Sequence, residues 1–85
     1  MKFTYNIVFN TKQGFFIRIA LLLERRGFDI ESLEISPSAK EGCSEMLLKV
    51  NGPSEKAEQV MKQISKLIDV VYVEEVTAYQ YAHVS

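Results

Sequence analysis

The hydrophobic residues of this sequence change their period several times, and the order of these changes is the feature that most constrains the fold. Residues 3–10 alternate between apolar and polar, which is typical of a half-buried strand. Residues 15–26 are apolar around most of a helical cylinder. Strand-like alternation returns over 28–36 and 43–51, helical 3–4 spacing over 57–68, and a strand-like run rich in Val and Tyr over 69–79.

The order β-α-β-β-α-β predicts an α+β sandwich of the ferredoxin-like class, with two helices on one face of a four-stranded antiparallel sheet. The right-handed crossover rule favours the strand order 4-1-3-2, so strands two and four form the edges. We expect one domain over residues 1–79 and a C-terminal tail over 80–85.

The junction between the first helix and the second strand has a strong stop signal. Arg25 and Arg26 suit the last helical turn, where cations face the negative end of the helix dipole. Gly27 suits the left-handed residue that ends a helix, and Phe28 resumes the apolar pattern with the period of a strand. In the second helix, Pro53 is predicted at the first helical position.

Composition excludes several classes of function. The 85 residues are 47% hydrophobic and carry a net charge of −1, so nothing indicates a nucleic-acid or membrane surface. Cys43 is the only cysteine, which fits a reducing cytoplasm. No histidine is placed to act as a base for its thiol, so a structural role is favoured over a nucleophilic one. His83 is the only histidine, so no metal-ligand cluster is predicted. The alternating pattern at the N-terminus predicts a strand and not a signal peptide.

Other activities known for this fold require residues that this sequence lacks. The first loop has only Lys12 to hold a phosphate, and it has no cysteine pair for copper. The open face of the third strand offers Glu45, Leu47 and Lys49 where an RNA-binding version needs aromatic side chains. The neighbouring Glu74 and Glu75 should point to opposite faces of a strand, so they cannot act on one substrate, and no catalytic residue is predicted.

The first helix has more apolar surface than a helix packed on one sheet needs. Its long apolar run is interrupted only by Arg18 before Glu24. We therefore expect a second buried contact, most simply a homodimer through this helix and the edge strand at 28–36.

The first loop is the remaining candidate for a binding site. Gly14 opens the helix, so the amides of Gly14, Phe15 and Phe16 can receive a carboxylate. Asp29 can accept an ammonium group, and the ligand side chain would lie against Ile30. A free amino acid presents both charges. The alternative is that Gly14 only starts the helix and Asp29 is a surface acid.

The residues from Leu22 to Leu33 contain the string Arg-Arg-Gly-Phe-x-Ile-Glu-Ser-Leu, and Lys-Leu-Ile-Asp-Val follows at 66–70. With Ser36-Pro37, these strings resemble the ACT domain of acetolactate synthase (acetohydroxyacid synthase) small regulatory subunits, from Tyr5 to Val76. The resemblance implies a side-by-side dimer that binds a branched-chain amino acid, usually valine, at its interface.

The resemblance also implies a cytoplasmic, non-catalytic subunit that binds no cofactor and activates a large subunit using thiamine diphosphate, magnesium and FAD. Thr11 stands where the family usually has asparagine, Asp29 also replaces an asparagine, and Phe15 replaces a small residue and could fill the ligand pocket. Without a second domain, the chain looks like the short type of small subunit, in which valine feedback can be missing. Two alternatives are a stand-alone ACT-type amino-acid sensor for another enzyme or transporter, and a small acyl- or phosphoryl-transfer enzyme.

Overall fold

The computed structural model describes residues 1–11 and 14–76 and has the predicted order of elements. The strands are β1 (Lys2–Asn10), β2 (Asp29–Pro37), β3 (Cys43–Asn51) and β4 (Val70–Glu75). The helices are α1 (Phe15–Arg25) and α2 (Ala57–Ser65), and a 3-10 turn η1 (Ser54–Lys56) precedes α2. None of the helices within the described residues is long and apolar enough to span a membrane.

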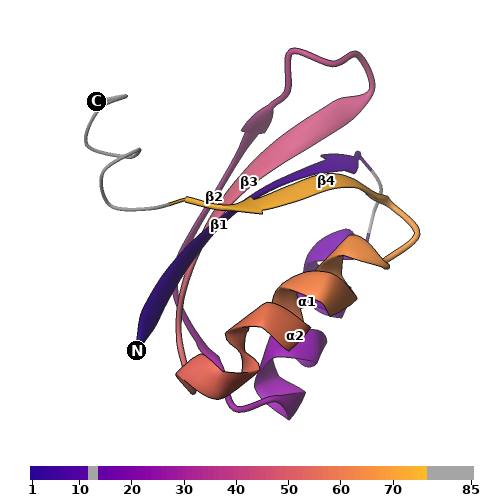
Figure 1. Ribbon diagram of the computed structural model, residues 1–85. Helices are drawn as coiled ribbons and strands as arrows, with labels where there is room; N and C mark the ends of the chain where they lie inside the picture. The colour runs from indigo at the N-terminus through magenta and orange to yellow at the C-terminus, as the bar shows by residue number, and fades with distance from the viewer. Residues whose placement is uncertain (12–13, 77–85) are drawn as a thin grey trace.

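The four strands form one antiparallel sheet in the order β2-β3-β1-β4, which confirms the predicted 4-1-3-2 arrangement. Both helices lie on the same face of this sheet, and α1 runs beside α2 (Figure 1). β2 and β4 are the edge strands. A sheet edge has unpaired backbone groups that can pair with another chain.

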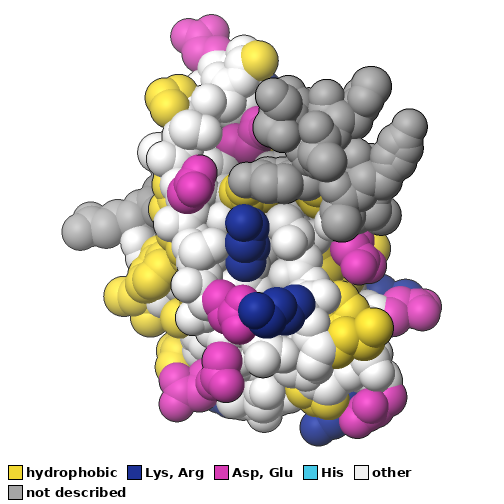
Figure 2. All heavy atoms as spheres, turned by 90° about the vertical axis from the view of Figure 1, so that its left-hand side faces the viewer, with side chains coloured by type: hydrophobic (Ala, Val, Ile, Leu, Met, Phe, Trp, Pro, Cys, Tyr) yellow, Lys and Arg dark blue, Asp and Glu magenta, His cyan; other side chains and the backbone are white. Residues whose placement is uncertain are grey.

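The core lies between the sheet and the helices, and its residues follow the predicted periods. β1 contributes Tyr5, Ile7 and Phe9; β3 contributes Met46, Leu48 and Val50; α1 contributes Phe15, Ile19 and Leu23; and α2 contributes Ala57, Val60 and Ile64. The opposite face of the sheet carries the alternate residues, and Figure 2 shows acidic and basic side chains intermixed on that side of the molecule.

The predicted stop at the end of α1 is confirmed in detail. Gly27 has φ +78, and its N–H donates to the Glu24 carbonyl at 3.1 Å. The Phe28 N–H donates to the Leu23 carbonyl at 3.0 Å. These two bonds form the Schellman arrangement that satisfies free carbonyls at a helix end. The chain thus leaves α1 in a fixed direction and enters β2 directly.

Two predictions about the second helix are wrong. Pro53 has an extended backbone, with ψ 127, and lies just before the helical turn. Its carbonyl accepts the first hydrogen bond of that turn. The proline ring fixes φ at −69, a value that fits an extended residue as well as a helical one, so the residue type alone did not decide between the two. Ile68 was placed in the apolar series of the helix, but α2 ends at Ser65 and the Ile68 side chain is 86% exposed. The predicted fourth strand ends at Glu75 within the described residues, and its predicted portion over 77–79, like the predicted tail over 80–85, lies outside them.

Candidate functional site

The start of α1 has the backbone geometry that the sequence predicts. Gly14 adopts φ +91, a left-handed conformation that other residues rarely adopt, although an added Cβ would meet no atom within 4 Å. Among the described residues no side chain caps this helix end, and the first turn of α1 contains no acidic residue. The first amides of a helix have no acceptor within the helix. The amides at this end are therefore suited to bind an anion.

The two phenylalanines after Gly14 have different environments. Phe15 is 1% exposed and stacks on Phe9, with ring centroids 4.2 Å apart and an interplanar angle of 13°. Its side chain belongs to the core of the chain. Phe16 is 48% exposed. The helical period turns it away from the core that its neighbour enters.

Thr11 lies beside an open groove at the edge of the sheet. Its N–H donates to the Gly42 carbonyl at 3.0 Å, and its hydroxyl shares a hydrogen bond with the Ser44 hydroxyl. The groove has a volume of about 510 Å³ and includes Ile35, Ser36 and Pro37 of β2 in its lining. This volume falls in the range of small-molecule sites, although the groove is open to solvent.

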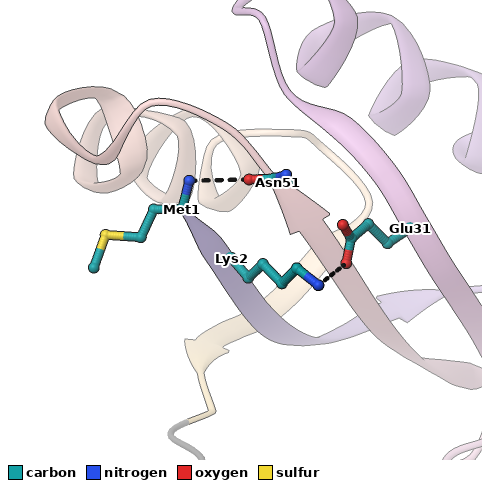
Figure 3. Close-up of polar contacts among 4 residues, drawn as sticks. All are labelled: Met1, Lys2, Glu31 and Asn51. Carbon is teal, nitrogen blue, oxygen red and sulfur yellow. Dashed lines mark hydrogen bonds and ion pairs between the residues drawn. The ribbon is translucent and has the colours of Figure 1, made fainter.

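Asp29 and Ile30 lie at the opposite end of β2. Asp29 pairs with Asn51, whose other neighbour in the sheet is Lys2 of β1. Figure 3 shows this end of the sheet, where the amino terminus donates to Asn51 Oδ1 at 2.9 Å. In the same view Lys2 Nζ lies 3.6 Å from Glu31 Oε1. Both Asp29 and Ile30 are exposed.

The sheet register separates the two halves of the candidate site within one chain. Asn10 of β1 pairs with Cys43 and Pro37 of β2 pairs with Ser44, whereas Asp29 pairs with Asn51 at the other end of β3. The seven steps from Ser44 to Asn51 span about 23 Å at ~3.3 Å per residue. An α-amino acid carries both charges on one carbon. A single protomer therefore cannot offer it the Gly14 amides and Asp29 together.

An ion pair that the sequence reasoning missed ties α1 to the start of β4. Arg18 Nη1 lies 3.0 Å from Asp69 Oδ2, and Asp69 is 4% exposed. The backbone carbonyl of Asp69 accepts the N–H of Asn10 at 2.8 Å. The signal in the sequence was Arg18 itself, the one polar residue in the apolar run of α1. The Arg18 side chain is itself half exposed, and it is the buried Asp69 carboxylate that requires a partner.

Tyrosines 5 and 72 show how burial differs across the sheet. Burial, with a smaller contribution from the nearby Glu75 carboxylate, raises the pKa of Tyr5 to about 12. The Tyr5 hydroxyl donates to the Ala57 carbonyl at 3.4 Å. Tyr72 is exposed, and a hydrogen bond to Glu74 is the main cause that raises its pKa.

The fold and sequence match known proteins over most of the chain. Residues 6–72 match the family described as the AHAS small subunit-like ACT domain, where AHAS stands for acetohydroxyacid synthase. A probable acetolactate synthase small subunit of Archaeoglobus fulgidus is 40% identical over 77 residues, which are 91% of this chain and 48% of that protein. The acetolactate synthase small subunit of Mycobacterium avium is 36% identical over 72 residues, covering 85% of this chain and 43% of that protein.

Solved structures agree with this assignment. The acetolactate synthase small subunit from Thermotoga maritima superposes with a TM-score of 0.80 at 31% identity, covering 92% of this chain and 48% of that one. The ACT domain of a GTP pyrophosphokinase from Chlorobium tepidum shares the fold, with a TM-score of 0.71 at 21% identity over 89% of this chain and 97% of that one. The chain spans about half the length of the curated relatives it matches. The chain belongs to the family of ACT domains of the acetolactate synthase small-subunit type.

Proposed function

We propose that this chain is a non-catalytic regulatory subunit that binds and activates the large subunit of a thiamine-diphosphate-dependent acetolactate synthase in cytoplasmic branched-chain amino-acid biosynthesis. The observation that carries the proposal is the small-subunit family match over residues 6–72, which includes the whole α1–β2 junction. Thiamine diphosphate, magnesium and FAD belong to the large subunit in this proposal, and this chain binds no cofactor.

The unit that regulates is a homodimer formed through β2 and α1. β2 is an edge strand on which Ile30 and Ile35 are exposed, and Phe16 and Ile17 are exposed on α1. Large apolar side chains gathered along an unpaired strand are typical of a subunit interface. A two-fold axis would pair the two β2 strands antiparallel and extend the sheet across both protomers.

This dimer supports an amino-acid site that one protomer cannot form. Antiparallel pairing sets the Asp29 end of one β2 strand beside the Pro37 end of the other, where the Thr11 groove and the start of α1 lie. The ligand carboxylate then meets the amides of Gly14, Phe15 and Phe16, and its ammonium meets Asp29 of the second protomer. Valine or another branched-chain amino acid fits, with its side chain against Ile30.

Light scattering coupled to size-exclusion chromatography tests the proposal. The chain alone should elute as a dimer at micromolar concentration. When mixed with the large subunit encoded in the same genome, it should co-elute with it as a complex of defined mass. A stable monomer would overturn the dimer. A dimer that does not co-elute with the large subunit would favour an ACT-type amino-acid sensor that regulates another enzyme or a transporter.

A further inference from the structure

The helical layer contains a second groove, which lies between α1 and α2 and is separate from the candidate amino-acid site. Its volume is about 410 Å³, and residues of both helices and of the segment that follows α2 contribute to its lining. Leu21, Leu22 and Leu67 make its apolar part. Leu22 and Leu67 pack partly against the core, whereas Leu21 is 46% exposed. The groove thus combines an apolar surface with access from outside.

Cations surround this apolar surface. Arg18, Arg25, Arg26 and Lys66 all line the groove, so four of the ten Lys and Arg residues gather here in a chain whose net charge is −1. Arg18 is paired with Asp69, and Arg26 Nη1 donates to the Leu22 carbonyl at 3.4 Å. Within residues 1–11 and 14–76, Arg25 and Lys66 form no ion pair. Their charges are therefore available to an acidic partner.

One polar atom in the same groove lacks a hydrogen bond. The Oε1 atom of Gln63 is buried and has no hydrogen-bond partner, the only such side-chain atom among the described residues. Gln63 lines the groove. A buried acceptor without a hydrogen bond is destabilising. A molecule in the groove would supply this bond only after the Gln63 side chain rotates to expose the atom.

We propose that this groove binds an acidic peptide segment of the acetolactate synthase large subunit, an inference that rests on the function proposed above. Carboxylates of the segment face Arg25 and Lys66, and an apolar side chain covers Leu21 and Leu67. A free inorganic anion would leave the leucines uncovered. The rest of the chain outside the groove carries a net negative charge, which would repel a nucleic acid.

The groove and the proposed dimer surface use different sides of α1. Residues three or four apart lie on one side of a helix, which places Arg18, Leu21, Leu22 and Arg25 together on the side facing α2. Phe16 and Ala20 share a different side of the helix, and Ile17, which lies one turn before Leu21, is at the boundary between the two sides. A dimer through β2 and Phe16 therefore leaves the side of α1 that faces α2 open to the large subunit.

Charge-reversal variants test this placement in a binding titration with the large subunit. Arg25→Glu and Lys66→Glu should each raise the dissociation constant by about tenfold, because each introduces repulsion at the edge of an electrostatic contact. Lys40→Glu makes the same change of charge in the β2–β3 turn, outside the groove, and should bind like the wild type. Circular dichroism melts confirm that each variant is folded, as expected for exposed side chains.

The outcomes separate the two proposals. If the wild type does not bind the large subunit, the proposed function fails, and the identity of the occupant fails with it. If the wild type binds and both reversals bind as tightly as Lys40→Glu, the function stands and the groove is not the contact. Fluorescence anisotropy with overlapping synthetic peptides that cover the large subunit identifies the bound segment. The proposal requires an acidic peptide whose affinity for the chain falls with Arg25→Glu. If only neutral or basic peptides bind, or if none binds, the proposal is overturned.

Discussion

Replacement of Gly52 by alanine should destabilise the domain because the new methyl group would collide with the ring of Phe28. The added Cβ would lie 2.5 Å from Cγ and 2.7 Å from Cε2 of that ring, with Cδ2 closer still. Carbon atoms prefer separations of about 3.5–4.0 Å, so the ring must move by about 1 Å. Phe28 is buried and packs on Phe3, with ring centroids 6.2 Å apart, so that movement disturbs the core.

Overpacking of this kind costs about 1–3 kcal/mol. For a domain of this size, ~2 kcal/mol corresponds to a fall in melting temperature of roughly 8–16 °C. Because Phe28 is buried immediately before Asp29 and Ile30, its displacement would also move the end of β2 that carries the candidate ligand contacts.

Urea denaturation followed by circular dichroism at one fixed protein concentration measures the effect. In a double-mutant cycle, Phe28→Leu should relieve the collision, so that Gly52→Ala costs less in that background than in the wild type. Gly42→Ala is the matched control, because a Cβ there meets no atom and its cost, which comes from φ +78 alone, should be independent of Phe28. An unchanged stability for Gly52→Ala, or full additivity with Phe28→Leu, would refute the reasoning.

Three further predictions concern the dimer, the ligand and the core. Ile35→Lys places a charge on the exposed edge of β2 and should raise the dimer dissociation constant about tenfold or more in light scattering, whereas Ile68→Lys, also at an exposed isoleucine, should leave it unchanged. Asp29→Ala should weaken valine binding by roughly 10- to 100-fold in calorimetry, and Glu34→Ala should not; tight binding that survives Asp29→Ala would refute the role of that carboxylate. The raised pKa of Tyr5, about 12 in the folded state against 10 when unfolded, means that the folded chain holds the proton more tightly. The protonated Tyr5 hydroxyl contributes up to about 2–3 kcal/mol to the free energy of unfolding. This contribution is complete below pH 10 and is lost as the pH rises towards 12. Tyr5→Phe should flatten the pH dependence of unfolding in that window, and an unchanged slope would contradict this cause.

The order of elements could be predicted because each carries its own local signal. Alternation marks β1 and β3, and Gly27 ends α1 with the positive φ that its position in the sequence indicated. Pro53 was misplaced because its fixed φ is compatible with two backbone conformations. Ile68 was misplaced because helical spacing cannot tell where the helix stops.

The candidate site was harder to predict because it depends on how the elements meet in space. The sequence suggested the special backbone of Gly14 and the acid at position 29, but only the sheet register sets them at opposite ends of one protomer. Phe15 was expected near the ligand, and its stacking on Phe9 depends on the rotation of α1 over the sheet. Arg25 and Arg26 were expected in the last turn of a helix, and the groove that they line together with Lys66 could not be predicted, because Lys66 comes from the end of a distant helix, directly after α2.

The most direct test of the regulatory role is the rate of acetolactate formation by the large subunit as this chain is added. We predict that the rate rises and saturates when the chain is present at a fixed stoichiometric ratio to the large subunit. The Ile35→Lys variant should require a higher concentration to reach the same rate. A rate that stays constant across the whole titration, with the chain confirmed as a folded dimer, would contradict the proposal that this ACT domain is a subunit of acetolactate synthase.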